Sequence, residues 1–187
     1  MNKPFSFKIL QEMDAIVTVS NSWLSRVIRL RTAGFKGWFS SSNIGSHVGI
    51  IVKKILPDNR VSFEVAEMMP RGLEINPIHN YFETDKDKSR IVAVVRNTCF
   101  NDDKNRDEAV GRLFTMHRFK TKYDYKELLG YAFPFLKDCP KSYYCSELFA
   151  QFCIWYGQPL QHPKYMGDNF PPYGVQKATN LEKMWTR

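Results

Sequence analysis

The chain has 187 residues, 43% of them hydrophobic and 14% aromatic, which suits one folded domain over residues 1–187 whose core needs neither disulfides nor metal. Its formal net charge of +8 favours anionic partners, but no nucleic-acid-binding motif accompanies the charge, so we do not expect a nucleic-acid partner. The sequence shows neither the apolar segment of a signal peptide nor a membrane span of roughly 18 apolar residues. We therefore expect a cytoplasmic protein, or a virion-associated one if a virus encodes it.

Four short apolar runs predict the strands of a sheet. They cover residues 15–19, 47–53, 61–69 and 90–96. The Pro-Asp-Asn turn at 57–59 joins the second run to the third, so these two strands should be neighbours. A helix is predicted over residues 23–30, between the first two strands.

Apolar residues at helical spacing predict two longer helices in the second half of the chain. The first covers residues 102–118, and its predicted inner face consists of Ala109, Val110, Leu113 and Phe114. The second begins after Ser142, a favourable N-cap, and ends at Gly157. Residues 158–187 should wrap over a core at about 13–157 and end in a short helix near 181–185.

The position of Cys145 in the first turn of the second helix raises the question of a reactive thiol. Unpaired N–H groups and the positive end of the helix dipole lower the pKa of a thiol there. The other cysteines are Cys99, Cys139 and Cys153. No C-x-x-C pair occurs among them, which indicates reduced thiols, with no metal site and no cofactor.

A cysteine nucleophile needs a base, and the chain offers four histidines. His79 and His162 lie beside prolines in predicted loops, and His117 continues the inner line of its helix as a core-edge residue. His47 opens an apolar strand, and Gly49 on the same strand face leaves room beside its ring. His47 is therefore the candidate base, although the pattern also fits a strand-end histidine with no role in catalysis.

Strand parity selects Glu67 as the group that would orient His47, because side chains alternate along a strand. Glu67 continues the apolar face of the predicted strand 61–69, whereas Glu64 points to the other face. The apolar residues of that face are Val61, Phe63 and Val65. A carboxylate there needs a partner, and His47 on the neighbouring strand can supply one. The alternative is a strand that ends before Glu67 and leaves it exposed.

The segments GSHVGIIV, VAEMMPRGLEI, KYDY and YYCSELF, in that order, resemble the circularly permuted papain-like amidohydrolases of the NlpC superfamily. The most similar branch is the YiiX-like one, related to lecithin–retinol acyltransferase. Its Ser-His-hydrophobic-Gly strand, its glutamate strand and its Tyr-Cys-Ser-Glu-Leu motif all have counterparts between residues 13 and 157. Met13-Asp14 stands where this family has a Gly-Asp pair, and the export signal common in the family does not occur here.

The resemblance implies an α+β fold, in which helices pack on a small, curled antiparallel sheet and the catalytic cysteine begins a helix. It also implies a cysteine hydrolase or acyl-transfer enzyme that cleaves an amide or ester bond. Cys145 would attack the acyl carbon, His47 would transfer the proton and Glu67 would hold the imidazole. The Cys145 N–H would form part of an oxyanion hole, with a second donor unassigned.

The predicted substrate-binding residues are Trp38, Phe39 and Tyr144. Trp38 and Phe39 lie in the Gly- and Ser-rich loop 33–46, directly before the His47 strand, and Tyr144 precedes the nucleophile. Aromatic rings beside the cations of this region suit an anionic acyl or peptide substrate, such as a lipid or a cell-wall fragment, and leave room for peripheral membrane contact. The rings could instead pin the loop to the core.

Two other classes of function stay open at this stage. One is a non-catalytic binding or structural protein on the same scaffold, for instance a particle-associated component. The other is a nucleic-acid-binding module, which would explain the charge of +8 but not the combination of Cys145, His47 and Glu67. The intact triad favours the enzyme over both.

Overall fold

The computed structural model describes residues 5–20, 25–26, 28–30, 44–69, 71–81, 90–123, 142–165 and 170–186. The predicted helix at 23–30 is described at residues 25–26 and 28–30, which are helical. Most of the aromatic loop 33–46 lies outside the described residues.

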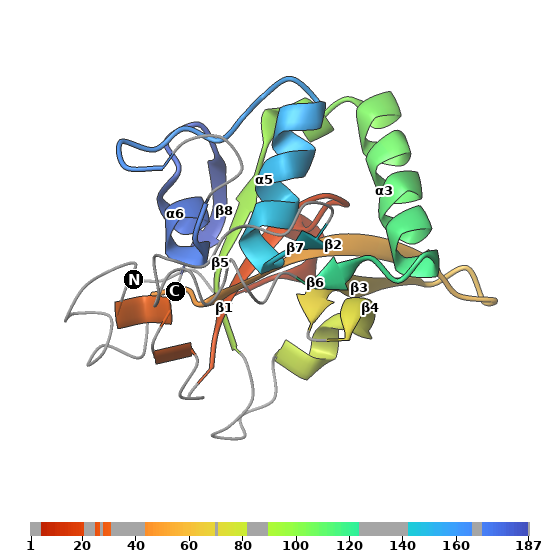
Figure 1. Cartoon of the computed structure of the whole chain (residues 1–187). Coiled ribbons are helices and arrows are strands. Elements are labelled where there is room, and N and C mark those ends of the chain that lie inside the picture. The colour runs from red at the N-terminus through yellow and green to blue at the C-terminus, as the bar shows by residue number, and fades with distance from the viewer. Residues whose placement is uncertain are drawn as a thin grey trace.

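The protein is an α+β structure built on one curled, six-stranded antiparallel sheet with the strand order β4-β3-β2-β1-β5-β8 (Figure 1). Its strands are β1 (Ala15–Val19), β2 (His47–Ile55), β3 (Val61–Met69), β4 (Gly72–Pro77), β5 (Arg90–Arg96) and β8 (Glu182–Thr186). A separate parallel pair joins β6 (Lys122–Tyr123) and β7 (Ser142–Tyr143). The helices are α3 (Asp103–Arg118), α5 (Cys145–Trp155) and α6 (Pro172–Lys177), with 3-10 turns η1 (Phe7–Ile9), η2 (Ile78–Tyr81) and η3 (Thr98–Phe100).

The four predicted strands are confirmed, and β2 continues to Ile55, two residues beyond its predicted end. The short helix predicted near 181–185 is wrong, because residues 182–186 form the edge strand β8. Backbone pairing with β5 holds this segment extended, with Trp185 opposite Val94. Most of β8 is exposed, so its sequence lacks the alternating apolar pattern that would have indicated a strand.

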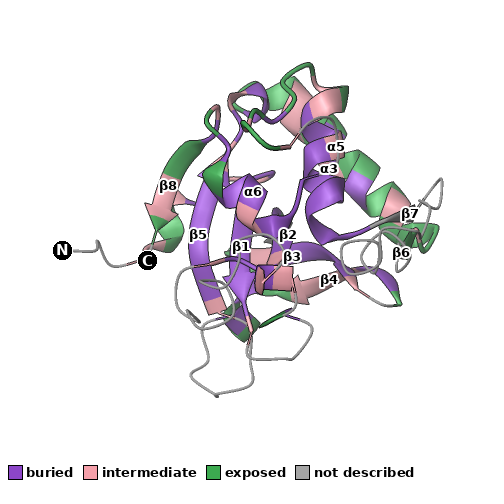
Figure 2. Cartoon of the chain, turned by 60° about the vertical axis from the view of Figure 1, so that its left-hand side comes forward, coloured by how far each residue is buried: buried purple, intermediate pink, exposed green. Residues whose placement is uncertain are grey.

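Alternating side chains divide the apolar core between the two faces of the sheet. Val48, Ile50 and Val52 of β2 belong to the cluster that also contains the buried residues of α3 and α5. Ile51 of β2 and Val65 of β3 belong to a smaller cluster on the other face. Figure 2 shows α5 and the central strands largely buried, whereas β8 at the sheet edge is partly exposed.

Helix α3 begins where the sequence predicts, with Asp102 as N-cap accepting a hydrogen bond from the Asn105 N–H at 2.9 Å. Ala109 and Leu113 are buried as predicted. The inward position of Phe114 is wrong, because its side chain is 44% exposed. The helix packs against β4 at the edge of the sheet, so only a narrow stripe of it is covered.

Candidate active site

The N-terminal end of α5 meets the sheet, and Cys145 is its first helical residue (Figure 1). The predicted N-cap Ser142 is wrong, because Ser142 lies in β7. Tyr144 is the N-cap instead, with extended backbone angles, and its N–H donates to Glu147 Oε2 at 3.1 Å. The helix therefore begins two residues later than Ser142 as N-cap would have placed it, with Cys145 at the position where backbone N–H groups lack intrahelical acceptors.

The Cys145 sulfur is in an environment that favours the thiolate. Its side chain is buried, with the residue only 2% exposed, and burial alone would raise the pKa of the thiol. The charge and the hydrogen bond of His47 oppose that effect, and so do the backbone N–H groups of Val48 and Ser146. The net result is a pKa below the ordinary value for cysteine.

His47 lies between Cys145 and Glu67. It is the first residue of β2, and the pairing of β2 with β3 begins two residues later, at Gly49. Its Nε2 is 2.6 Å from Glu67 Oε2. Burial would lower the pKa of the imidazole, but Cys145 and then Glu67 raise it well above its usual value. Both shifts favour the charged forms of the pair, the imidazolium of His47 and the thiolate of Cys145.

The predicted orientation of Glu67, on the apolar face of its strand and in contact with His47, is confirmed. Glu67 is buried beside Val65 on the face that carries the smaller core cluster, with its side chain 7% exposed. Glu64 is half-buried, and its position in β3 directs it to the other face. Burial would raise the pKa of Glu67, but His47, Tyr81 and Asn76 lower it below the usual value for a glutamate.

Sequence reasoning missed two residues of this site, Asn76 and Tyr81. Asn76 Nδ2 donates to Glu67 Oε1 at 3.0 Å, and the Tyr81 hydroxyl donates to the same oxygen. They belong to β4 and η2, neither of which was predicted. The signal available was the alternation of Leu73 and Ile75 with Glu74 and Asn76, which is typical of a strand that follows β3 through a tight turn.

Gly49 does leave room on its strand face, but a core side chain fills that room. A Cβ atom at this position would lie 2.3 Å from Cγ1 of Val65, so the space belongs to the neighbouring strand and not to a substrate. The close approach of β2 and β3 is the reason for the glycine here.

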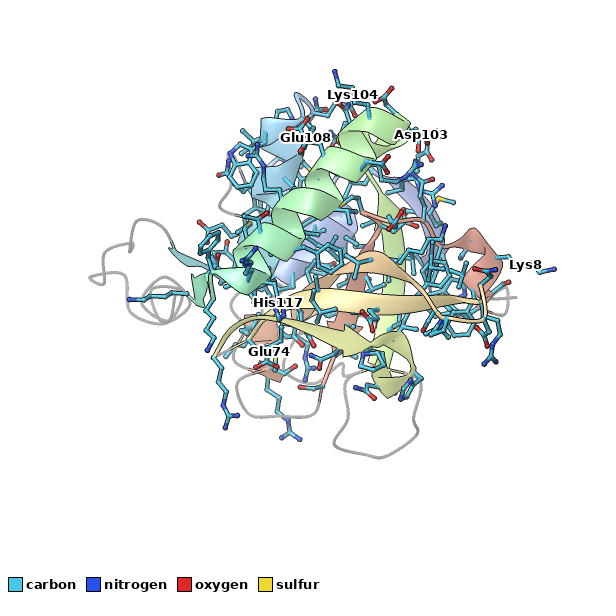
Figure 3. The ribbon with its side chains drawn as sticks, turned by 90° about the vertical axis from the view of Figure 1, so that its right-hand side faces the viewer. Lys8, Glu74, Asp103, Lys104, Glu108 and His117 are labelled. Carbon is cyan, nitrogen blue, oxygen red and sulfur yellow. The ribbon has the colours of Figure 1, made fainter. Side chains whose placement is uncertain are left out.

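The other three histidines lie elsewhere in the fold. The Nδ1 atom of His117 is 2.8 Å from the Leu73 carbonyl oxygen, which places this residue between α3 and β4 (Figure 3). The predicted core-edge position is thereby refined, because His117 is mostly exposed. His79 is an exposed residue of η2, and the ring of His162 contacts Tyr165 at a centroid distance of 4.7 Å.

The other described cysteines differ from Cys145. Burial raises the pKa of Cys99 to about 12 and that of Cys153 well above its ordinary value. Cys139 lies outside the described residues. Of the three thiols that the structure describes, Cys145 is therefore the one whose pKa is lowered.

Of the three residues predicted to bind substrate, the structure describes one, Tyr144. Trp38 and Phe39 lie outside the described residues. Tyr144 is fully buried in the main core, and its assignment as a substrate-binding residue stays a prediction. Its position at the N-cap orients the first turn of α5.

A buried arginine lies near the triad. Arg29 is 1% exposed, and its Nη1 donates to Ser25 Oγ at 3.2 Å. The Ser25 hydroxyl is hydrogen-bonded to Ser46, the residue before His47. Burial and then the charge of neighbouring cations lower the pKa of Arg29. Those cations are Arg26 and Arg90.

A cavity of about 660 Å³ lies away from the triad. Its lining includes Lys53 near the end of β2 and Phe63 near the start of β3, together with Lys8 and Asp103 (Figure 3). Lys53 is six residues from His47 along one strand, a separation of about 20 Å. The cavity is therefore separate from the contact between Cys145, His47 and Glu67.

Neither the family models nor the curated proteins with which the sequence was compared contain a match. Within the described parts of the chain, no three His, Cys, Asp or Glu side chains gather as a metal site would require. None of the helices in those parts has the length and apolar character needed to cross a bilayer.

Proposed function

We propose that the protein is a cysteine hydrolase or acyl-transfer enzyme that cleaves an amide or ester bond. The observation that carries this proposal is the continuous contact from Glu67 through His47 to Cys145 at the start of α5. The pKa of the thiol is lowered, which favours the nucleophilic thiolate, and the pKa of the imidazole is raised, which favours the protonated form that can donate a proton.

The reaction would proceed through a thioester. The Cys145 thiolate attacks the acyl carbon, and His47 gives its proton to the departing amine or alcohol as that bond breaks. A water molecule or another acceptor then attacks the thioester carbon, His47 takes its proton, and the Cys145 thiolate leaves. Glu67 stabilises the imidazolium, and the Cys145 N–H is a candidate oxyanion donor at the helix N-terminus.

We assign the fold to the permuted papain-like class of the NlpC superfamily on the order and position of these elements. The histidine strand precedes the cysteine helix, and α5 packs on β2. Met13, where the family has glycine, has a φ of 68°, the left-handed region that glycine tolerates best. The following Asp14 is buried and accepts two hydrogen bonds from Arg96, at 2.7 and 2.8 Å.

An anionic acyl lipid or an acidic cell-wall peptide is the substrate class that the surroundings favour. Arg29 and the two neighbouring cations lie at the same end of the sheet as His47. Positive charge near a site raises the local concentration of anionic substrates and accelerates their binding.

Labelling of the full chain with an acyl-directed cysteine probe, followed by mass spectrometry, tests this function. Probe attached to Cys145, and lost in Cys145→Ser, would support it. The same experiment distinguishes the enzyme from a second candidate, a non-catalytic binding protein on the same scaffold. The low exposure of Cys145, 2%, is the observation that favours this second candidate. A Cys145 that iodoacetamide modifies but that no acyl probe labels would overturn the catalytic proposal.

A further inference from the structure

The two carboxylate oxygens of Glu67 have different partners. Oε2 lies 2.6 Å from His47 Nε2. Oε1 accepts one hydrogen bond from Asn76 Nδ2 at 3.0 Å and another from the Tyr81 hydroxyl. Rotation of the carboxylate out of this plane would break all three bonds, so the two donors on Oε1 help to set its orientation from the side opposite the imidazole.

Both donors are suited to hold a carboxylate permanently. Tyr81 is buried in the smaller core cluster, where its ring packs among apolar side chains. Burial and then the nearby Glu67 raise the pKa of its hydroxyl far above the ordinary value, so the proton stays on the oxygen. The Asn76 amide does not titrate. Glu67 therefore keeps two donors on Oε1 over the whole pH range in which a protein stays folded.

We propose that Tyr81 and Asn76 are positioning residues of the catalytic unit, which act on Cys145 through Glu67 and His47. Their hold on Oε1 presents Oε2 to His47 Nε2, and the other ring nitrogen, Nδ1, is left for the thiol. This inference rests on the proposed function and extends the triad by two donors from β4 and η2.

The same two donors also help His47 to keep Glu67 ionised. The groups that face its carboxylate are His47 from β2 and Tyr81 from η2, together with Asn76 and the cross-strand Glu74 from β4. His47, Tyr81 and Asn76 favour the ionised form of Glu67. Without the Tyr81 hydroxyl, the buried carboxylate would bind a proton more readily. A protonated Glu67 no longer stabilises the imidazolium, and the thiolate loses its counter-ion.

Tyr81→Phe tests the proposal, because it removes the hydroxyl and keeps the buried ring. The rate of Cys145 alkylation by iodoacetamide is measured against pH on the full chain, which requires no substrate. Loss of one hydrogen bond to a charged group should move the acid limit of the profile upward by about one pH unit, an approximately tenfold lower rate on that limb. Asn76→Ala should move it in the same direction. Tyr165→Phe, at a half-buried tyrosine that packs against His162, is the matched control and should leave the profile in place.

A second set of variants separates positioning from a purely structural role. In a Glu67→Gln background, Tyr81→Phe should change the alkylation rate less than about twofold, because the carboxylate through which it acts is gone. An equal loss in both backgrounds would show that Tyr81 supports the fold and nothing more.

The outcomes also separate this inference from the proposed function. A wild-type Cys145 that titrates like an ordinary thiol would overturn the ion pair, and both proposals with it. A wild-type thiol of low pKa, with a profile that Tyr81→Phe does not move, would overturn only the positioning role.

Discussion

Gly49 and Val65 face each other so closely that a Cβ atom on the glycine would lie 2.3 Å from Cγ1 of the valine. Gly49 is also the cross-strand partner of Glu67 and lies two residues from His47. The packing of the smaller core cluster and the spacing of the triad therefore depend on the same glycine.

Gly49→Ala should lower the free energy of unfolding by about 1–3 kcal/mol, the usual cost of forcing an extra carbon into a packed core. Urea denaturation monitored by circular dichroism would measure the loss. The site should respond as well where β2 relieves the clash by moving away from β3, because His47 and Glu67 lie on these two strands.

Gly111→Ala is the matched control for this change. Gly111 lies in α3, and a Cβ atom there would have no neighbour within 4 Å. Alanine should therefore stabilise the helix by up to about 1 kcal/mol. If the Gly49→Ala variant had the same free energy of unfolding as the wild type, the contact between Gly49 and Val65 would be less close than described.

The three described cysteines should differ in their reactivity. At neutral pH and before unfolding, iodoacetamide should modify Cys145 first, because its pKa is lowered by His47 and by backbone N–H groups. Cys99 and Cys153 should react only after denaturation, since burial raises the pKa of each. Mass spectrometry of peptides at successive times gives the order, and a faster Cys153 would contradict the assignment of the nucleophile.

The pH dependence of Cys145 alkylation follows from the directions of the two pKa shifts. The pKa of the Cys145 thiol lies below its ordinary value, so the rate should already rise at a pH where ordinary thiols are protonated. The pKa of the His47 imidazole lies well above its ordinary value, so the counter-ion should stay protonated at a pH where a free imidazole is neutral. The ion pair exists at pH values above the pKa of the thiol and below the pKa of the imidazole. The profile is measured as the alkylation rate at constant ionic strength.

His47→Ala should reverse this shift. Burial, the largest influence on the Cys145 thiol, raises its pKa, and without the imidazolium only the smaller effect of the Val48 and Ser146 N–H groups opposes it. The rise in alkylation rate should then move above the pH at which an ordinary cysteine reacts. An unchanged profile in His47→Ala would mean that the helix N-terminus alone lowers the pKa.

The sequence predicted the central strands and the triad because both rest on strong local patterns. Apolar runs mark β1, β2, β3 and β5, and parity within β3 separates Glu67 from Glu64. Tyr81 and Asn76 could not be found in this way, since their role depends on a turn from β3 into β4 that brings a second polar layer beside Glu67. Edge strand β8 was missed for a similar reason, because its backbone pairing with β5 defines it more than its side chains do.

The last prediction concerns turnover once a substrate is found. His47→Ala should lower kcat by on the order of 100-fold or more, the usual scale for the loss of a general base. Glu67→Gln should cost less, because an amide oxygen can still accept the Nε2–H but carries no charge to stabilise the imidazolium. Glu64→Gln, on the other face of β3, is the matched control and should be nearly silent. Its half-buried side chain could affect folding, so the melting temperature of all three variants is measured with the rates. Equal losses from the two glutamate changes, at unchanged melting temperature, would mean that the charge of β3 matters as a whole and that the contact between Glu67 and His47 has no special role.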